Sequence, residues 1–367
     1  MAESRLFKPL KIGNIEVQHR IGMAPLTRLR ATAAHVPTPL MVEYYSQRAS
    51  APGTLIISEG TFVSPSACGG FANAPGIWNQ AQVDGWKAIT DEVHRKGCFI
   101  YCQIFAMGRA ADAEVAKRDG VSFVGPSAIP IEEGGAIPRT MSIAEIKQMI
   151  RDFASAAENA VKAGFDGVEC HGGNGYLADQ FIQENSNRRD DEWGGSVENR
   201  SRFIDEVMKG VVAAVGAERV GLRLTPWSLF QGMRMEDPIP QFSDIIDKAR
   251  QLNLAYLHLV ESRVSGAVDR EEGSERLDFA YKLWNGPLLV AGGYKLADAR
   301  KLVDEEYPDR DIMVVFGRYF ISNPDLVYRL KEGLDFSAYE RTTFYSGSAV
   351  GYVDYPLGAE NLASREV

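Results

Sequence analysis

Eight short apolar runs, separated by longer amphipathic stretches, are the feature of this sequence that most restricts its fold. They cover residues 21–24, 54–58, 99–104, 167–170, 220–224, 255–260, 287–291 and 312–316. Runs such as 288–291 (LLVA) and 312–316 (IMVVF) are apolar throughout, which is typical of strands buried on both faces of a parallel sheet. A (β/α)8 TIM barrel closes with eight strands that alternate with helices, so the sequence predicts an α/β fold of this type.

The intervening stretches carry the 3.6-residue period of amphipathic helices. In residues 81–95, Val83, Trp86 and Ile89 recur on one helical face, and residues 141–163 show the same pattern. Further helices are predicted at 196–215, 242–252, 277–284, 295–306 and 324–331.

Three segments fall outside this repeat. Residues 8–20 predict a β-hairpin that turns at Gly13 and closes the barrel floor. Residues 106–139, rich in Gly, Ala and Pro, are too long for an ordinary βα loop, and we expect an insertion after the third strand that caps the mouth. Residues 336–367 form a C-terminal tail. Because no low-complexity linker interrupts residues 1–367, the chain is predicted to be a single domain.

Charge and apolar content exclude several classes of function. The 40 Lys+Arg and 49 Asp+Glu give a formal net charge of −9, which disfavours binding to nucleic acid or to an anionic membrane. No apolar run reaches the roughly 20 residues of a membrane helix, and residues 1–10 lack the apolar core of a signal peptide. Four cysteines without a CxxC pair are too few for a disulfide framework. We therefore expect a cytoplasmic protein without nucleic-acid or membrane partners.

Polar residues recur where the predicted strands end. They are Thr27, Glu59 with Gly60, Gln103, His171 with Asn174, Arg223, Glu261, Gly292 with Gly293, and Gly317 with Arg318. In a barrel of this type the carboxyl ends of the strands converge on one mouth. Because buried polar groups need partners, we expect a ligand to bind there.

Two of these strand ends carry a phosphate signature. Gly292 and Gly293 precede a predicted helix, and Gly317 and Arg318 end the last strand. Glycines let backbone N–H groups approach a phosphate, and Arg supplies positive potential. The alternative is that the glycines are tight turns and Arg318 forms a surface ion pair. Two such ends at neighbouring strands, where barrels of this type commonly bind phosphate, favour the phosphate site.

The segment 170–176 (CHGGNGY) holds the densest set of candidate catalytic groups. His171 and Asn174 are two donors on one glycine-rich turn, which is the arrangement that clamps a carbonyl oxygen, and Tyr176 is a weak acid close by. A buried core histidine is the alternative for His171. Residues 173–178 also match the dinucleotide fingerprint, but they lie in the fourth βα unit rather than the first, so we reject that match.

Other chemistries lack their residues in this sequence. Only His171 among five histidines lies at a strand end, so no metal site is predicted. No Lys stands at a strand end for Schiff-base chemistry, and neither a G-x-S-x-G elbow nor a Walker loop occurs.

With these residues identified, the chain resembles the old yellow enzyme family of FMN-dependent ene-reductases along nearly its whole length. The matching segments are 6–10 (LFKPL), 23–28 (MAPLTR), 76–78 (GIW), 171–177 (HGGNGYL), 189–203 (RDDEWGGSVENRSRF), 223–226 (RLTP), 316–326 (FGRYFISNPDL) and 351–356 (GYVDYP). Residues 47–54 and 108–112 are similar to the fungal branch of that family, which includes ergot-alkaloid pathway members.

The resemblance implies that FMN binds non-covalently across the mouth. The residues that would contact it are Pro25, Leu26 and Thr27 along the flavin, Gly60 packed on the ring, Gln103 at the pyrimidine edge, Arg223 at the N1–C2 end, and Gly292, Gly293, Gly317 and Arg318 at the phosphate. A fixed guanidinium at the N1–C2 end favours the reduced, anionic flavin.

The implied activity is NADPH-dependent reduction of the activated C=C bond of α,β-unsaturated carbonyl compounds. Hydride would pass from flavin N5 to the substrate Cβ while His171 and Asn174 hold the carbonyl oxygen and Tyr176 protonates Cα. Phe105, where many relatives carry Trp, and Tyr345 would contact the substrate.

Two alternatives stay open. One is a pathway-specific fungal reductase or isomerase that acts on an unsaturated aldehyde or iminium of the ergot-alkaloid type. The other is a flavin-binding barrel without turnover, against which the joint presence of His171, Asn174 and Tyr176 argues. The choice between NADPH and NADH and the formation of a homodimer also stay open.

Overall fold

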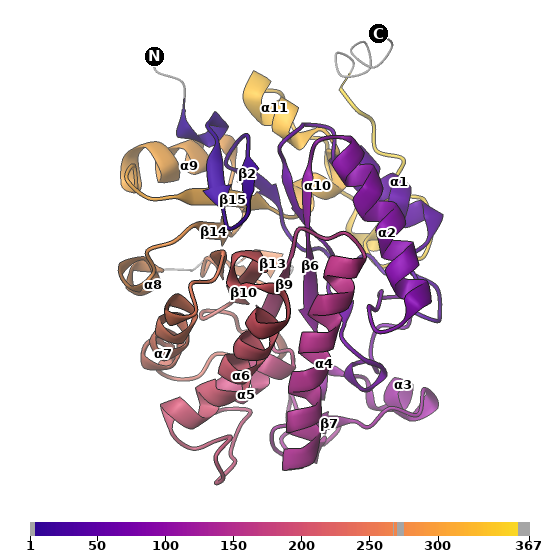
Figure 1. Cartoon of the computed structure of the whole chain (residues 1–367), viewed down its shortest axis with the longest axis vertical. Coiled ribbons are helices and arrows are strands. Elements are labelled where there is room, and N and C mark those ends of the chain that lie inside the picture. The colour runs from indigo at the N-terminus through magenta and orange to yellow at the C-terminus, as the bar shows by residue number, and fades with distance from the viewer. Residues whose placement is uncertain (1–3, 267, 270–274, 359–367) are drawn as a thin grey trace.

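Eight parallel strands close into a barrel in the computed structural model, which describes residues 4–266, 268–269 and 275–358. They are β3 (Ile21–Met23), β4 (Leu55–Ile57), β6 (Phe99–Phe105), β9 (Gly167–Gly172), β10 (Val220–Leu224), β11 (Tyr256–Val260), β14 (Leu288–Ala291) and β15 (Ile312–Phe316). Each strand pairs in parallel with the next, β4 pairs with β6, and β15 returns to β3 (Figure 1). The predicted (β/α)8 TIM barrel is therefore confirmed.

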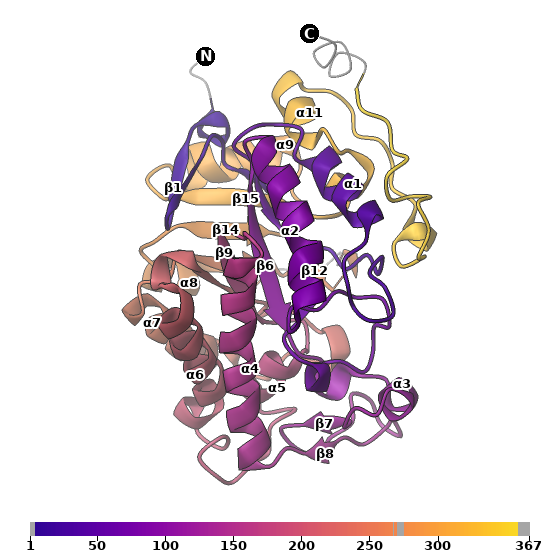
Figure 2. The same ribbon diagram turned by 45° about the vertical axis from the view of Figure 1, so that its right-hand side comes forward.

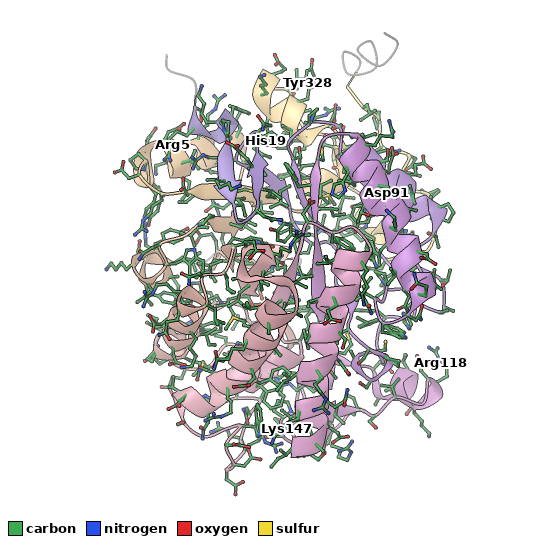
Figure 3. All side chains as sticks on the ribbon, viewed as in Figure 1. Arg5, His19, Asp91, Arg118, Lys147 and Tyr328 are labelled. Atoms are coloured by element: carbon green, nitrogen blue, oxygen red, sulfur yellow. The ribbon has the colours of Figure 1, made fainter. Side chains whose placement is uncertain are left out.

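Helices surround the barrel. They are α1 (Pro39–Arg48), α2 (Gln80–Arg95), α4 (Ile143–Lys162), α5 (Leu177–Ile182), α6 (Val197–Val215), α7 (Pro238–Gln251), α8 (Asp278–Leu283), α9 (Leu296–Lys301) with η6 (Leu302–Glu306), α10 (Arg318–Ser322) and α11 (Leu326–Glu332). Capping boxes begin α2 and α4. Figure 3 shows Asp91 and Lys147 on the outer faces of these two helices, where both side chains are exposed. None of the helices in the described part of the chain is at once long enough and apolar enough to span a membrane.

The predicted hairpin closes one end of the barrel. Strands β1 (Leu10–Ile12) and β2 (Ile15–Val17) are antiparallel, and Gly13 takes a positive φ of 51° in the turn. The apolar residues of the hairpin share one buried cluster with inward-facing residues of β4, β6, β11, β14 and β15. A side chain at Gly13 would collide with the backbone of Glu218, so the close fit of this turn requires glycine.

Two tyrosines fill the barrel interior above the hairpin. A Cβ at Gly167 would lie 2.3 Å from Cε1 of Tyr101, and a Cβ at Gly221 would lie 2.2 Å from Cζ of Tyr256. Both tyrosines are fully buried and their ring centroids are 5.5 Å apart. The glycines on β9 and β10 therefore make the space in which these rings pack.

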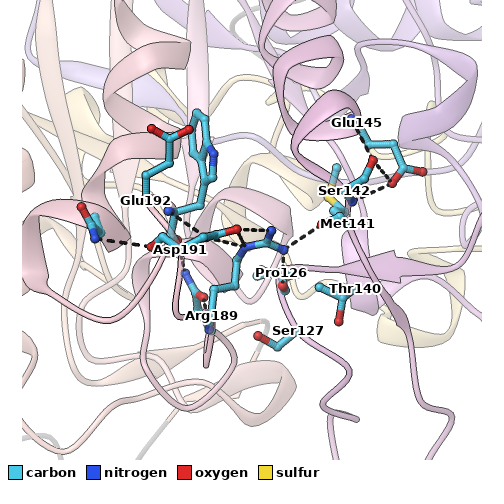
Figure 4. A network of polar contacts seen from close by, with 12 residues as sticks. Pro126, Ser127, Thr140, Met141, Ser142, Glu145, Arg189, Asp191 and Glu192 are labelled. Carbon is cyan, nitrogen blue, oxygen red and sulfur yellow. Dashed lines mark hydrogen bonds and ion pairs between the residues drawn. The ribbon is translucent and has the colours of Figure 1, made fainter.

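The insertion after the third barrel strand lies at the far end of the molecule from the hairpin (Figure 2). It contains η3 (Gly108–Ala110), α3 (Ala113–Arg118), β7 (Val124–Gly125) and β8 (Arg139–Thr140), the last two forming a small parallel sheet. Arg189 binds the residue that follows each strand of this sheet: its Nη1 donates to the carbonyls of Pro126 (2.9 Å) and Met141 (2.7 Å), and its guanidinium pairs with Asp191 (Figure 4). The predicted insertion is thus fixed to the segment that leads into α6.

Smaller strands complete the structure. The strand β5 (Thr61–Phe62) pairs with the end of β6, and β12 (Val264–Ser265) pairs with β13 (Val268–Asp269) in the loop after β11. Residues 267 and 270–274 of the loop after β11, and residues 359–367 of the predicted tail 336–367, lie outside the described part of the chain.

The packing of Tyr256 over Gly221 generates a stability prediction. We expect Gly221→Ala to lower the free energy of unfolding by about 1–3 kcal/mol, because the added methyl group has no space beside a fully buried ring. Gly210→Ala is the matched control. It lies in α6 with its nearest neighbour at an ordinary 3.7 Å, so the same change should raise the free energy of unfolding by up to about 1 kcal/mol. Urea denaturation of both variants measures the difference, and equal stability would contradict the packing.

Candidate active site

A cavity of about 800 Å³ opens at the carboxyl ends of the barrel strands. The loops after β3, β9, β10, β11, β14 and β15 contribute to its wall. The predicted site residues that line it are Pro25, Leu26, Thr27, Asn174, Tyr176, Arg223, Gly292, Gly293, Gly317, Arg318 and Tyr345. The fold therefore brings eleven predicted site residues from distant parts of the chain to one cavity.

The four remaining predicted residues lie next to this wall rather than in it. The ring centroids of His171 and Phe105 are 5.3 Å and 5.0 Å from that of Tyr176. Gly60 packs on Phe105, since a Cβ there would lie 3.0 Å from Cε1 of that ring. Gln103 lies deeper in the barrel, where its Nε2 donates to Glu169 at 2.7 Å.

The turn that carries Asn174 and Tyr176 is held by hydrogen bonds from both sides. Asn174 takes a positive φ of 56°, and its N–H donates to Oγ1 of Thr225 at 2.8 Å. The next N–H, of Gly175, donates to Oδ2 of Asp179 at 2.8 Å. Burial raises the pKa of Asp179 to about 7, against the opposing effect of its hydrogen bonds. Tyr176 directly precedes α5, so the turn is fixed at both ends.

The insertion supports this turn from outside. Gln180 on α5 donates from Nε2 to the carbonyl of Gly175 at 2.7 Å and accepts from the N–H of Arg109 at 2.9 Å. The Arg109 guanidinium donates in turn to the carbonyls of Pro130 (3.1 Å) and Gln231 (3.3 Å). The insertion, the Asn174 turn and the loop after β10 are therefore linked in one hydrogen-bond network.

Burial sets the protonation states at the site. It lowers the pKa of His171 to about 3, and the positive charge of Arg223 acts in the same direction, so the imidazole is neutral. Burial also raises the pKa of Tyr176 above its usual value, which keeps the phenol protonated. The site thus presents neutral donors and a neutral acid.

Several buried side-chain nitrogens at the mouth lack a hydrogen-bond partner among the described residues. Nε and Nη1 of Arg223 and Nδ1 of His171 make no hydrogen bond to any residue that the structure describes. Burying unpaired guanidinium nitrogens costs free energy, and a ligand with acceptor atoms would remove that cost. This arrangement fits the edge of a planar ring that carries carbonyl and imine acceptors.

The opposite side of the cavity fits a phosphate. Gly292 and Gly293 take φ values of 149° and 69°, and a Cβ at Gly292 would lie 2.6 Å from Cβ of Glu261. At the end of the neighbouring strand β15, a Cβ at Gly317 would lie 3.5 Å from Cδ2 of Leu26, and Nη1 of Arg318 donates to the hydroxyl of Tyr339 at 3.1 Å. Small backbone groups beside a guanidinium are the usual surroundings of a bound phosphate.

Residues that the sequence analysis did not identify complete the cavity wall. Phe71, Phe230, Arg263, Tyr319, Tyr339 and Phe344 also line it. Phe344 and Tyr345 come from the C-terminal tail, which Arg28 holds by donating to the carbonyls of Phe344 (3.2 Å) and Gly351 (2.7 Å). The resemblance to the family indicated Tyr345, whereas no local sequence pattern indicated Phe344.

Metal ligands do not gather anywhere in the described residues: no group of three or more His, Cys, Asp and Glu side chains could hold an ion. Of the cysteines, Cys170 is fully buried beside His171, and burial raises the pKa of its thiol to about 12.

Comparison with known proteins gives concordant matches. Residues 5–336 match the model of the NADH:flavin oxidoreductase / NADH oxidase family. The chain is 50% identical over 365 residues to the NADP-dependent oxidoreductase lnbE of Aspergillus flavus, covering 96% of each chain. It is 50% identical over 361 residues to the chanoclavine-I aldehyde reductase fgaOx3 of Penicillium roqueforti, covering 97% of each.

A solved structure agrees with these sequence matches. The Old Yellow Enzyme from Pichia sp. AKU4542 superposes with a TM-score of 0.90 at 39% identity, covering 98% of this chain and 95% of that one. The resemblance to old yellow enzymes and to their fungal branch is confirmed.

The phosphate end of the cavity can be tested by ligand binding. We expect Arg318→Gln to weaken FMN binding about 10- to 100-fold, because a charge-assisted hydrogen bond to the phosphate is lost. Riboflavin has no phosphate and should bind the variant and the wild-type chain equally. Fluorescence titration of the apoprotein measures both affinities.

Arg341→Gln serves as the matched control for this variant. Both guanidiniums lie 5.6 Å from the Tyr339 ring, but Arg341 does not line the cavity, so its loss should leave FMN affinity unchanged. Equal weakening of FMN and riboflavin by Arg318→Gln would contradict a phosphate at this position.

Proposed function

Because the chain belongs to the NADH:flavin oxidoreductase / NADH oxidase family, we propose that it is an FMN-dependent ene-reductase. In this proposal it uses NADPH to reduce the activated C=C bond of α,β-unsaturated carbonyl compounds. The observation that carries the proposal is the convergence of a neutral His171, Asn174 and a protonated Tyr176 at one end of the cavity.

The residues of the mouth are well suited to hold FMN non-covalently. Arg223 offers unpaired guanidinium nitrogens to the pyrimidine, and Gly292, Gly293, Gly317 and Arg318 offer a cradle to the phosphate. Pro25, Leu26 and Thr27 line the same cavity between these ends. FMN, when bound, supplies the exchange of two electrons between NADPH and the substrate.

The chain itself supplies orientation and a proton. His171 and Asn174 donate to the carbonyl oxygen of the substrate, where negative charge increases as the double bond is reduced. Each such donor contributes about 3–4 kcal/mol to the transition state in comparable sites. Tyr176 holds its proton at Oη and delivers it to the substrate Cα.

A narrower activity is a second candidate. One of the two fungal relatives with 50% identity, fgaOx3 of Penicillium roqueforti, is named a chanoclavine-I aldehyde reductase, and its match covers 97% of both chains. The aromatic side chains of Phe71, Phe230, Phe344 and Tyr345 line the cavity mouth and suit a large, flat apolar substrate. We infer an unsaturated aldehyde attached to such a ring system as the substrate class of this second candidate.

The role of Tyr176 gives a kinetic prediction. In Tyr176→Phe, reoxidation of the reduced flavin by an enone should slow by about 100-fold or more, because no acid remains to protonate Cα. Reduction of the flavin by NADPH should change little, since that step transfers no proton from this residue. Stopped-flow absorbance at the flavin band measures the two half-reactions separately.

Tyr355→Phe is the matched control. Tyr355 does not line the cavity, and its hydroxyl accepts a hydrogen bond from the N–H of Glu340 at 3.1 Å, so both half-reactions should retain nearly wild-type rates. Equal slowing of both half-reactions in Tyr176→Phe would contradict the assignment. A yellow protein that never consumes NADPH in the presence of enones would instead indicate a flavin-binding barrel without turnover.

The protonation states predict a flat pH profile. The pKa of His171 is lowered to about 3, so the imidazole stays neutral at every pH well above that value. The pKa of Tyr176 is raised above its usual value of about 10, so the phenol keeps its proton. Neither group should therefore give an inflection between about pH 6 and about pH 9 when an enone oxidises the reduced enzyme. Asp179, whose pKa is raised by burial to about 7, is replaced by Asn to separate its titration from theirs. An inflection near the ordinary histidine pKa that persists in the single-turnover rates of Asp179→Asn would show that His171 titrates there, contrary to this expectation.

A further inference from the structure

A fully buried carboxylate, Glu169, lies in the barrel interior one layer below His171. It comes two residues earlier on β9, so both side chains point into the barrel. Three groups donate to it: Nε2 of Gln103 at 2.7 Å, the hydroxyl of Tyr256 at 3.1 Å and Nδ1 of His258 at 2.7 Å. The chemistry derived above assigns no role to this residue.

The surroundings of Glu169 determine its charge. Burial raises the pKa of the Glu169 carboxyl. The combined effect of His258, Arg223 and the hydrogen bond from Gln103 is larger and opposite, so the pKa lies below its usual range. Burial lowers the pKa of His258, which stays neutral and donates through Nδ1. Glu169 is therefore a single negative charge surrounded by neutral donors.

This charge fixes the orientation of Gln103. An ionised carboxylate has no proton and can only accept hydrogen bonds, so the amide group that faces it must be the NH2. The amide oxygen of Gln103 is thereby directed away from Glu169. Gln103 can then present an acceptor to a ligand in the mouth.

The negative charge of Glu169 also offsets the positive charge of Arg223, although no hydrogen bond joins the two described side chains. Arg223 is paired in register with His171 on β9 and with His258 on β11, and electrostatic attraction to Glu169 raises its pKa against the effect of burial. Three neutral donors already occupy most of the roughly four acceptor positions of the carboxylate. Nε and Nη1 of Arg223 consequently make no hydrogen bond within the described residues.

We propose that Glu169 is a positioning residue of the flavin site: it directs the amide oxygen of Gln103 toward the pyrimidine N3–H and offsets the charge of Arg223, so that it lowers the reduction potential of the bound flavin. This inference rests on the proposed function, because it assumes that FMN occupies the mouth. Glu169 acts through Gln103 and Arg223 and does not touch the reacting atoms.

The first test is the reduction potential of bound FMN in Glu169→Gln. The variant keeps the shape of the side chain and removes its charge, which leaves Arg223 unbalanced beside the reduced, anionic flavin. With an effective dielectric constant of about 20, one charge at about 12 Å, between two and three strand spacings, changes the relative affinity for reduced over oxidised FMN about tenfold. For a two-electron couple this is a positive shift of about 30 mV. Spectroelectrochemical titration of the holoprotein measures it.

Tyr256→Phe is the matched control for a structural role. It removes one hydrogen bond to Glu169 and leaves the charge in place, so the potential should stay at the wild-type value. An unchanged potential in Glu169→Gln, or equal shifts in both variants, would overturn the inference. A wild-type chain that is colourless after incubation with FMN and removal of the unbound flavin would overturn the proposed function as well. The two failures are therefore distinguishable.

The second test uses FMN methylated at N3 and also applies to the wild-type chain alone. An acceptor oxygen facing N3–H predicts at least about tenfold weaker binding of the methylated flavin than of FMN. In Glu169→Gln the Gln103 amide can turn over, and the difference between the two ligands should become smaller. Equal binding of both flavins by the wild-type chain would overturn the inference even if the variant does not fold.

Discussion

The alternation of side chains along eight parallel strands, closed into one ring, is the constraint on which the rest of this structure depends. Every second residue must point into the barrel, and the register aligns these residues in layers. In the two layers below the mouth, β9, β10 and β11 contribute His171, Arg223 and His258 to the upper one, and β6 and β9 contribute Gln103 and Glu169 to the lower one. The neighbouring strands contribute apolar residues, so the interior is polar on one side only.

The separation of polar from apolar side chains inside the barrel determines where a ring with both polar and apolar edges can bind. The hairpin and the tyrosines above it close one end of the barrel with apolar packing. Buried polar groups can therefore meet a ligand only at the other end, where Arg223 keeps unpaired nitrogens. The phosphate glycines lie past the apolar strands β14 and β15, which requires the ligand to extend across the mouth.

The parts of this arrangement that depend on local sequence could be predicted. The eight apolar runs coincide closely with the barrel strands, and the strand-end residues meet at one cavity. The helix α1 was missed because its charged and polar residues mask the period, and α5 and α10 are too short to show one. The position of Tyr345 depends on hydrogen bonds from Arg28 to a segment more than 300 residues away, which no local pattern encodes.

Glu169 illustrates a different reason for a missed residue. The strand-end criterion selects residues at or just past the end of each predicted strand, such as His171, whereas Glu169 lies two positions before His171 and one layer deeper. Side chains alternate between the two faces of a strand, so Glu169 points to the same side as His171 and is buried with it. A carboxylate in an otherwise apolar run indicates that it has a polar partner inside the barrel. Arg223 in one layer and Glu169 in the next then give these two layers no net charge without a ligand. A ring that gains negative charge on reduction meets the free nitrogens of Arg223, while neutral His171 and Tyr176 keep the substrate side uncharged. Under the proposed function, the barrel thus separates the charge that would stabilise the cofactor from the donors that would hold the substrate.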